Sequence, residues 1–338
     1  MTSKAGLAVM ALAMGGLLPS ARAGTIDAIY AFGDSLSDVG NAFIATSGAE
    51  PGAPYVNGQF SNGAVWVQDL AAGLGLAPLT PSLAGGTDYA FGAGETGPTS
   101  YNTSNPASDL TGPTGQVAQF LAVDPTANPD GLYTIWIGAN DLSDILAGAS
   151  PSAYAADIAT SVANVDSAIT ALAGAGAKNF LIVTVPDLGV TPGATSLGPV
   201  VAGALSALSA GFDTTLVDGG GPIPSLAALA GLEGLNLSVL DTYSLVDSIV
   251  ASPASYGFTN ATSPCLTGEV NYSGGTPCSP SVAVQDQYLF WDEIHPTAAG
   301  HAVVADAALD VLAPEPGSVL LTAGGLLGLG LALRKRRA

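Results

Sequence analysis

The chain is nearly devoid of basic residues. Lysine and arginine together number 7 against 27 aspartates and glutamates in 338 residues, and Lys178 is the only base between residues 23 and 333. Nucleic acids and anionic membranes are bound mainly through lysine and arginine. This deficit therefore excludes nucleic acid as a partner. The acid excess predicts a soluble, strongly negative surface. No loop has the spaced Asp, Asn and Glu ligands that calcium binding would need.

Histidine and cysteine are also scarce, with two of each. They are spread over several segments without the spacing of metal ligands, so the sequence predicts no metal site and no cofactor. One of the two histidines, His295, stands three residues after Asp292 in Trp291-Asp292-Glu293-Ile294-His295-Pro296. That pairing gives the first indication of a function.

The first 23 residues have the pattern of a secretory signal. Lys4 precedes an apolar stretch over residues 5–18, and Ala21-Arg22-Ala23 places small residues at positions −3 and −1 of a cleavage site before Gly24. The apolar stretch is short for a membrane span. We therefore expect export across a membrane and processing by a signal peptidase.

The last 25 residues form a second sorting pattern. Pro314-Glu315-Pro316 is followed by 17 uncharged residues, Gly317–Leu333, and then by the basic run Arg334–Arg337. This order resembles the PEP-CTERM tail of Gram-negative surface proteins. The resemblance implies a transmembrane segment within 314–338, transient membrane anchoring, removal by an exosortase-type enzyme, and delivery to the cell surface or the medium.

Two cysteines, Cys265 and Cys278, enclose a loop rich in glycine, proline and serine. In an exported protein we expect them to form a disulfide, and two free thiols are the alternative.

Residues 24–313 are predicted to form one domain, because no repeat or linker interrupts them. Apolar runs typical of buried strands alternate with helical patterns, which favours a parallel sheet covered by helices on both faces. The predicted strands are Ile26–Phe32, Leu132–Ile137, Phe180–Val185 and Leu237–Leu240, with a short one near Tyr89–Phe91. The predicted helices are Ala64–Leu74, Gln116–Val123, Ser152–Ala173, Leu197–Leu216 and Pro296–Leu312.

Four separated segments carry side chains suited to acyl transfer. They are Gly33–Ser37, Ala90–Thr96, Gly138–Asp141 and Asp292–His295. A serine hydroxyl needs a base to take its proton, and the imidazole needs a carboxylate to hold its tautomer. Ser35 is thus the predicted nucleophile, His295 the base and Asp292 its partner. The Ser35 N–H, a backbone N–H within Gly92–Gly94 and the Asn140 amide are expected to bind the oxyanion.

The Ser, Gly, Asn and His blocks, in this order, resemble those of the GDSL or SGNH serine hydrolases. The segments Tyr256–Asn260, Leu289–Asp292 and Val185–Leu188 resemble its secreted esterase and lecithinase-like branch. The resemblance spans Ile26 to Leu312. It implies a three-layer α/β/α, flavodoxin-like fold with a central parallel sheet, and hydrolysis without a cofactor.

The second block departs from the family pattern. Many relatives have two adjacent glycines where this chain has Gly92-Ala93-Gly94. Gly94 is favoured as the oxyanion donor because Gly94-Glu95-Thr96 best matches the Gly-Asp-Thr form, and Gly92 and Ala93 are alternatives. Asn140, taken alone, could instead be a helix cap.

Three functions are compatible with these patterns. The first is an exported esterase or lipase acting on acyl esters. The second is a deacetylase of O-acetylated matrix polysaccharide, and the third is a surface protein that uses the fold only as a scaffold. The complete set of Ser35, Asp292 and His295 argues against the scaffold. His301, on the last predicted helix, is expected to be a packing residue.

Overall fold

The computed structural model describes residues 26–97 and 108–313. The expected signal (1–23) and sorting tail (314–338) lie outside the described residues. A four-stranded parallel sheet forms the centre, in the order β1-β2-β3-β4. Its strands are β1 Ile29–Gly33, β2 Leu132–Trp136, β3 Asn179–Val183 and β4 Asn236–Leu240. The register aligns the first residues of neighbouring strands, Ile29 with Leu132 and Leu132 with Asn179.

A further segment extends the sheet beyond β1, where the sequence predicts a short strand. Ala31 N–H donates to the Thr87 carbonyl at 3.1 Å, and Tyr89 N–H donates to the Ala31 carbonyl at 2.7 Å. Only an isolated parallel bridge between Ala31 and Asp88 forms, so the segment is not a regular strand. Counted as an edge, it gives the spatial order 2-1-3-4-5 of flavodoxin-like folds.

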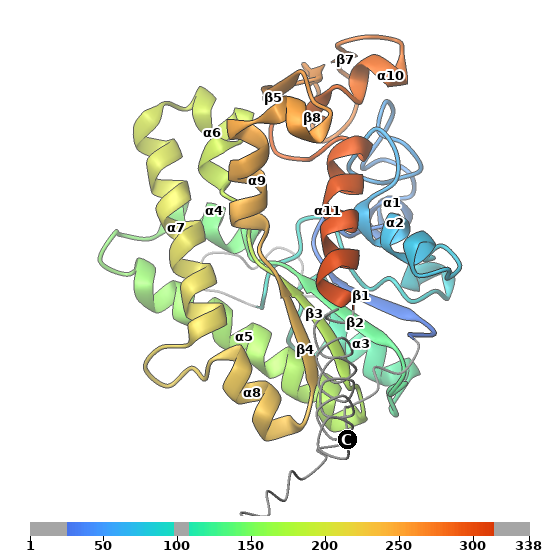
Figure 1. Cartoon of the computed structure of the whole chain (residues 1–338), viewed down its shortest axis with the longest axis vertical. Coiled ribbons are helices and arrows are strands. Elements are labelled where there is room, and N and C mark those ends of the chain that lie inside the picture. Colours follow the sequence, from blue (N-terminus) through green and yellow to red (C-terminus); the bar gives the residue numbers. More distant parts are fainter. Residues whose placement is uncertain (1–25, 98–107, 314–338) are drawn as a thin grey trace, which may run out of the picture.

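Helices cover both faces of the sheet (Figure 1). One layer contains α3 Gln116–Val123, α5 Tyr154–Ala175, α7 Pro199–Asp218 and α8 Leu226–Glu233. The other contains α2 Trp66–Gly73 and α11 Ala298–Leu312, which pack on each other. Because side chains alternate across a strand, β2 sends Tyr133 and Ile135 to the first layer and Trp136 to the second.

The remaining elements lie in the connections. The short helices are α1 Asn41–Ala45, α4 Ala139–Gly148, α6 Pro192–Ser196, α9 Thr242–Ala251 and α10 Val282–Gln285. The 3-10 helices are η1 Ser82–Ala84, η2 Leu188–Val190 and η3 Pro253–Tyr256. Strand β5 Asn260–Pro264 pairs in parallel with β8 Tyr288–Phe290, and β6 Leu266–Thr267 pairs antiparallel with β7 Thr276–Pro277.

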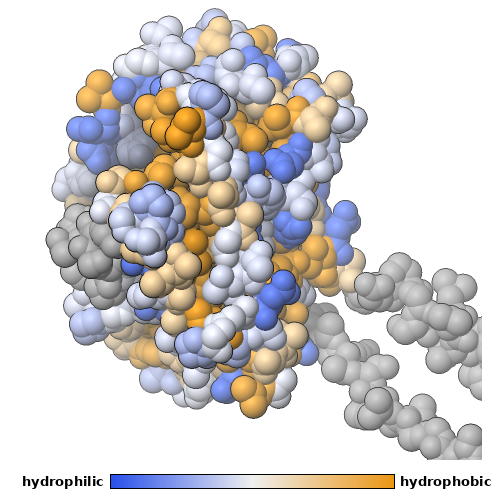
Figure 2. Space-filling model, turned by 90° about the vertical axis from the view of Figure 1, so that its left-hand side faces the viewer, coloured by the Kyte–Doolittle hydropathy of each residue, from blue (hydrophilic) through white to orange (hydrophobic). Residues whose placement is uncertain are grey.

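Within the part of the chain that the structure describes, two helices, α5 and α7, are long and apolar enough to cross a membrane by length and composition. Both helices pack on the sheet. Helices that pack in the core of a globular α/β fold can have the same apolar composition. The face that carries α7 mixes apolar and polar side chains (Figure 2).

Candidate active site

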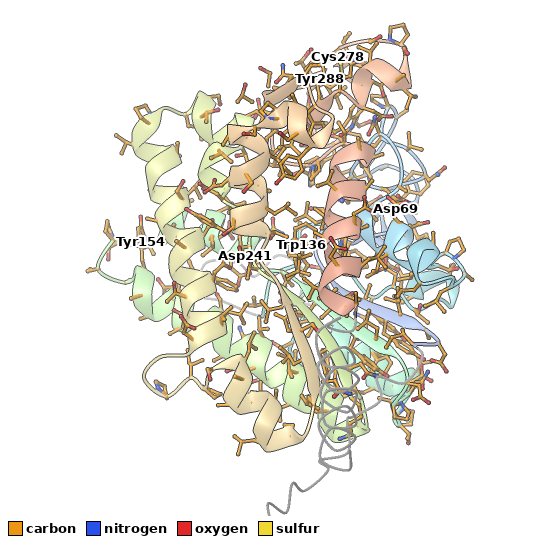
Figure 3. The ribbon with its side chains drawn as sticks, viewed as in Figure 1. Asp69, Trp136, Tyr154, Asp241, Cys278 and Tyr288 are labelled. Atoms are coloured by element: carbon orange, nitrogen blue, oxygen red, sulfur yellow. A yellow bond between two sulfur atoms is a disulfide. The ribbon has the colours of Figure 1, made fainter. Side chains whose placement is uncertain are left out.

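The site lies at the carboxyl ends of the parallel strands, where ligands bind in open α/β sheets. Ser35 follows β1, Asn140 lies in α4 after β2, and His295 lies between β8 and α11. Trp136 and Asp241, labelled in Figure 3, mark the ends of β2 and β4 beside it.

The turn that carries Ser35 is held by the backbone on both sides. Asp34 N–H donates to the Trp136 carbonyl at 3.3 Å, and the Asp34 carbonyl accepts from the N–H groups of Ser37 and Asp38. Gly33 makes the approach to β2 possible, since a Cβ there would lie 2.3 Å from the Trp136 carbonyl oxygen. The strand-to-turn geometry therefore requires glycine at position 33.

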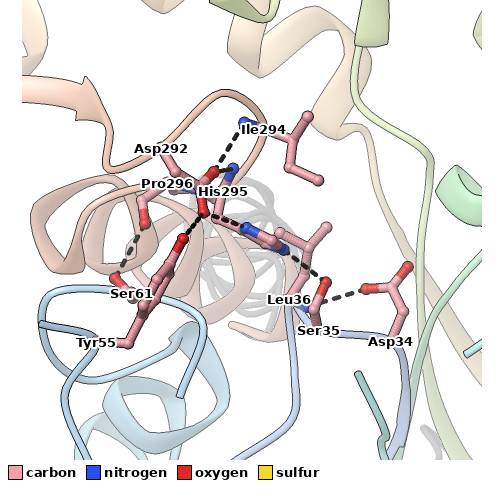
Figure 4. Close-up of polar contacts among 9 residues, drawn as sticks. All are labelled: Asp34, Ser35, Leu36, Tyr55, Ser61, Asp292, Ile294, His295 and Pro296. Carbon is pink, nitrogen blue, oxygen red and sulfur yellow. Dashed lines mark hydrogen bonds and ion pairs between the residues drawn. The ribbon is translucent and has the colours of Figure 1, made fainter. Parts of the chain in front are cut away.

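Ser35, His295 and Asp292 form one hydrogen-bonded chain (Figure 4). The distance from His295 Nε2 to Ser35 Oγ is 2.8 Å, and that from His295 Nδ1 to Asp292 Oδ2 is 2.7 Å. All three side chains are buried, with 8% of Ser35 exposed to solvent. The structure thus brings together the three residues that the sequence places in the predicted triad.

The His295 loop is stabilised by Asp292 itself. Its Oδ1 accepts the backbone N–H groups of Ile294 at 2.8 Å and His295 at 2.7 Å. Burial alone would raise the pKa of Asp292, but the imidazole charge and these hydrogen bonds outweigh it and lower the pKa. Asp292 therefore remains an anion facing the imidazole.

The last helix begins two residues later than predicted, at Ala298, because the Thr297 side chain caps it.

Tyr55 is a member of this cluster that sequence reasoning missed. Its hydroxyl donates to Asp292 Oδ2 at 2.7 Å across 237 residues of sequence. No local sequence pattern around Tyr55 predicts this contact, because the two segments come together only in the folded chain.

The Asn140 side chain contacts the segment Ala90–Thr96, the second of the four sequence blocks. Its Nδ2 donates to the Gly94 carbonyl at 2.8 Å, and the other amide hydrogen has no acceptor among the described residues. The helix-cap alternative is wrong: the N-cap of α4 is Gly138, no side chain caps that helix, and Asn140 lies within it.

The choice of Gly94 as an oxyanion donor needs correction. Gly94 N–H donates to the Phe91 carbonyl at 2.9 Å, and Gly92 N–H donates to the Asp38 carboxylate at 2.8 Å. Both groups are therefore engaged. Between them, Ala93 has a φ of +58°, and its N–H forms no hydrogen bond within residues 26–97 and 108–313. The sequence favoured Gly94 because Gly94-Glu95-Thr96 matches the Gly-Asp-Thr form. Such a match does not show in which direction a backbone N–H points.

Asp34 places a second carboxyl group beside the serine. Its Oδ1 accepts Leu36 N–H at 3.0 Å, while its Oδ2 is buried without a partner in the part of the chain that the structure describes. Burial raises the pKa of Asp34 to about 7, although the nearby imidazole opposes this shift.

An apolar pocket opens beside Ser35. Ser35, Asn140 and His295 are among the residues that line it. Its other walls are mostly apolar and include Trp136, Leu188, Val246, Ile249, Phe290 and Val304. Such a lining suits a hydrocarbon chain next to the hydroxyl.

The structure also places the two cysteines and the second histidine. Cys265 and Cys278 are joined by a disulfide. His301 is fully buried in α11, where burial lowers its pKa to about 3. No group of three or more His, Cys, Asp or Glu able to hold a metal occurs among residues 26–97 and 108–313.

The sheet, the site and the sequence blocks define an α/β hydrolytic protein. The sequence profile of the GDSL-like lipase/acylhydrolase family matches residues 29–308, and the chain belongs to this family.

Curated relatives carry related names. The chain is 29% identical to the thermolabile hemolysin of Vibrio parahaemolyticus, over 84% of this chain and 63% of the hemolysin. It is 28% identical to lipase 1 of Photorhabdus luminescens, over 87% of this chain and 51% of the lipase. It thus spans only about half to two thirds of these two relatives. The phosphatidylcholine-sterol acyltransferase of Aeromonas hydrophila is 27% identical, over 83% of this chain and 88% of that protein.

Among solved structures, a putative GDSL-like lipase from Parabacteroides merdae aligns with a TM-score of 0.40 and 12% identity. The alignment covers 85% of this chain and 95% of that one.

Proposed function

We propose that this protein is an exported serine hydrolase that cleaves carboxylic acyl esters through a Ser35-His295-Asp292 triad. The observation that carries the proposal is the continuous hydrogen-bonded chain from Ser35 Oγ through the imidazole to Asp292. Family membership supports the esterase or lipase chemistry. The secretory pattern of residues 1–23 and the sorting pattern of 314–338 support export and surface delivery.

The reaction proceeds through an acyl-enzyme. Ser35 Oγ attacks the ester carbonyl carbon while His295 Nε2 takes the hydroxyl proton, and Asp292 stabilises the resulting imidazolium. The tetrahedral intermediate collapses, and the alcohol leaves with the proton from His295. Water then attacks the acyl-enzyme with His295 again as base, which releases the acid and restores Ser35.

The developing oxyanion needs donors that do not have to reorganise. The Ser35 N–H and the second hydrogen of the Asn140 amide are two candidates, and Ala93 N–H replaces that of Gly94 as the third. The Ala93 segment lies against the nucleophile turn, because Phe91 N–H donates to the Gly33 carbonyl at 3.1 Å. Gly94 contributes indirectly, since its carbonyl holds the Asn140 amide.

The pocket favours an acyl chain longer than acetyl. Apolar side chains from β2, α9, β8 and α11 line it beyond the serine. An acetyl group would leave most of this surface unused. We therefore place acyl-ester hydrolysis ahead of polysaccharide deacetylation, and the intact relay ahead of a non-catalytic scaffold.

The decisive experiment measures p-nitrophenyl esters from acetate to longer acyl chains with the protein and its Ser35→Ala variant. We expect turnover that increases beyond acetate. In Ser35→Ala we expect kcat to fall by about 10⁴-fold or more with the melting temperature unchanged. An organophosphonate should label Ser35. Full activity in Ser35→Ala, or labelling of another serine, would exclude the proposed nucleophile, and a preference for acetyl esters would favour the deacetylase.

A further inference from the structure

The oxygen of Asp292 that faces the imidazole has a second donor. Asp292 Oδ2 accepts both His295 Nδ1 and the Tyr55 hydroxyl, each at 2.7 Å. Tyr55 is 6% exposed, and burial together with the Asp292 charge raises its pKa well above the usual value. Tyr55 therefore stays protonated at neutral and mildly basic pH, so its hydroxyl remains a hydrogen-bond donor to Asp292 there.

Tyr55 is held by the loop that the disulfide closes. Gly52 N–H donates to the Tyr272 carbonyl at 2.9 Å, and Gly274 N–H donates to the Ala53 carbonyl at 2.7 Å. Tyr272 and Gly274 lie inside the Cys265–Cys278 loop. The loop is thus tied to the chain just before Tyr55.

Aromatic contacts continue this connection to the imidazole. The Tyr55 ring packs edge-on against Trp291 at 6.2 Å and against Tyr272 at 6.4 Å between centroids. Tyr272 and Phe60 in turn contact the His295 ring at 5.5 and 5.3 Å. On the other side, Cys265 N–H donates to the Phe290 carbonyl, two residues before Asp292.

We propose that Tyr55 is a positioning residue for the triad, and that the disulfide-closed loop over residues 265–278 holds it on Asp292. This inference rests on the proposed function. Tyr55 does not touch the reacting atoms. Its hydroxyl fixes the rotation of the carboxylate, so that Oδ2 stays in line with His295 Nδ1, and it disperses part of the carboxylate charge.

The pH dependence distinguishes this role from simple packing. Without the hydroxyl, Asp292 directs more negative charge at the imidazole and favours its protonated, inactive form. The acidic limb of the kcat/KM profile should then move to higher pH. The other titratable groups around His295 are the same in the variant that lacks this hydroxyl. They are Asp34 from the β1 turn, Glu269 and Tyr272 from the disulfide loop, Glu293 two residues before His295, and His301 from α11.

The test is Tyr55→Phe, which keeps the ring contacts. We expect kcat on a p-nitrophenyl ester to fall about tenfold with KM little changed, as for loss of a hydrogen bond to a charged group. The acidic limb should rise by about half a pH unit. Tyr133→Phe is the matched control, because it removes a buried hydroxyl that donates to Asn128 away from the site, at 3.1 Å. It should leave both kcat and the limb unchanged.

A second variant tests the loop. Cys265→Ala/Cys278→Ala should move the acidic limb in the same direction, and should move it less in a Tyr55→Phe background, because coupled residues are not additive. Equal shifts in both backgrounds would remove the loop from the proposal. A Tyr55→Phe protein with wild-type kcat and limb, or one that loses only thermal stability, would overturn the role of Tyr55. Failure of the proposed function itself looks different: the unmodified protein would not hydrolyse esters, or Ser35→Ala would do so equally well.

Discussion

At the scale of residues, Asp292 is the centre of the site. It accepts four hydrogen bonds, two from the backbone of its own loop and one each from His295 and Tyr55. A buried carboxylate with so many donors stays ionised, which agrees with its lowered pKa. Because the pKa of Asp292 is lower in the folded state than in the unfolded chain, its ionised carboxylate stabilises the fold at neutral pH. This stabilisation is lost as the pH falls below the ordinary pKa range of aspartate.

Replacing Asn140 tests its role at the oxyanion. Asn140→Ala removes the proposed oxyanion donor, and kcat should fall by about 10²–10³. The melting temperature should change little, because only one part-buried hydrogen bond, to the Gly94 carbonyl, is lost. Steady-state kinetics and thermal unfolding check this.

The control is Asn164→Ala, which removes another part-buried amide. Asn164 Nδ2 donates to Thr96 Oγ1 at 3.3 Å. Its loss should leave kcat within about twofold of the wild-type value. Equal kinetic losses in the two variants, or a large stability loss with modest kinetics in Asn140→Ala, would remove Asn140 from the oxyanion site.

The residues that the sequence could place are those in a short local pattern or in a block that resembles the family, as for Ser35, which lies 260 residues from His295. Asp292 and His295 are three residues apart, and their loop brings them together through local hydrogen bonds. Tyr55 and Ala93 could not be placed in this way. The contact of Tyr55 is set by a loop closed far along the chain, and the availability of Ala93 N–H depends on where its neighbours' N–H groups point.

At the scale of elements, α9 forms part of the pocket wall. The helix begins at Thr242, where the Asp241 side chain accepts Ser244 N–H at 2.9 Å and caps it. About one and two turns further on, Val246 and Ile249 line the pocket beside Ser35. The helix thus places apolar side chains where the acyl chain of the substrate would lie.

Filling the pocket should change the chain-length preference. Val246→Trp adds bulk to one wall, so kcat/KM for long acyl esters should fall by about tenfold or more relative to acetate. Val200→Trp is the control, because Val200 is 84% exposed on α7 and outside the pocket. The ratio of rates on long and acetyl esters is the measurement, and a ratio unchanged by Val246→Trp would place the acyl chain elsewhere.

Elements with apolar patterns were predictable: strands buried on both faces, such as β2 and β3, leave a nearly continuous apolar run, and helices packed on the sheet leave an apolar stripe. The four central strands and helices α2, α3, α5, α7 and α11 lie within a few residues of their predicted positions. Helices α1, α4, α6, α8, α9 and α10 were not predicted. All are short, and α9 has a cap that is visible only as an isolated aspartate.

At the scale of the whole molecule, the shortage of bases leaves buried carboxyl groups without cationic partners. Among residues 26–97 and 108–313, the one ion pair is between His295 and Asp292. Burial raises the pKa of Asp38 and Asp141 to about 6 and that of Asp213 to about 8. It also raises the pKa of Asp88 well above the usual value, and the neighbouring Asp38 adds to that shift.

These raised pKa values predict that the protein is more stable in mild acid than in mild base. Between the ordinary pKa of aspartate, about 4, and the raised values, the folded state binds more protons than the unfolded chain. Stability therefore falls as the pH rises from about 4 to the raised pKa values, which lie at about 6 for Asp38 and Asp141 and about 8 for Asp213. One pKa unit corresponds to about 1.4 kcal/mol, and 1 kcal/mol to roughly 2–4 °C in larger domains. The melting temperature should therefore be lower at pH 8 than at pH 5 by about 5 °C or more.

Thermal unfolding from pH 5 to 8 at constant ionic strength checks this, with Asp213→Asn as the matched variant. Asparagine can keep the acceptor for Val185 N–H, which Asp213 Oδ1 binds at 2.8 Å, but it cannot ionise. The fall in melting temperature between pH 7 and 8 should therefore be smaller in Asp213→Asn. High salt should not abolish the slope, because salt screens exposed charges much more than buried ones. A slope that disappears in salt would assign the effect to repulsion among surface acids, and a melting temperature that rises from pH 5 to 8 would contradict the buried carboxyl groups as its cause.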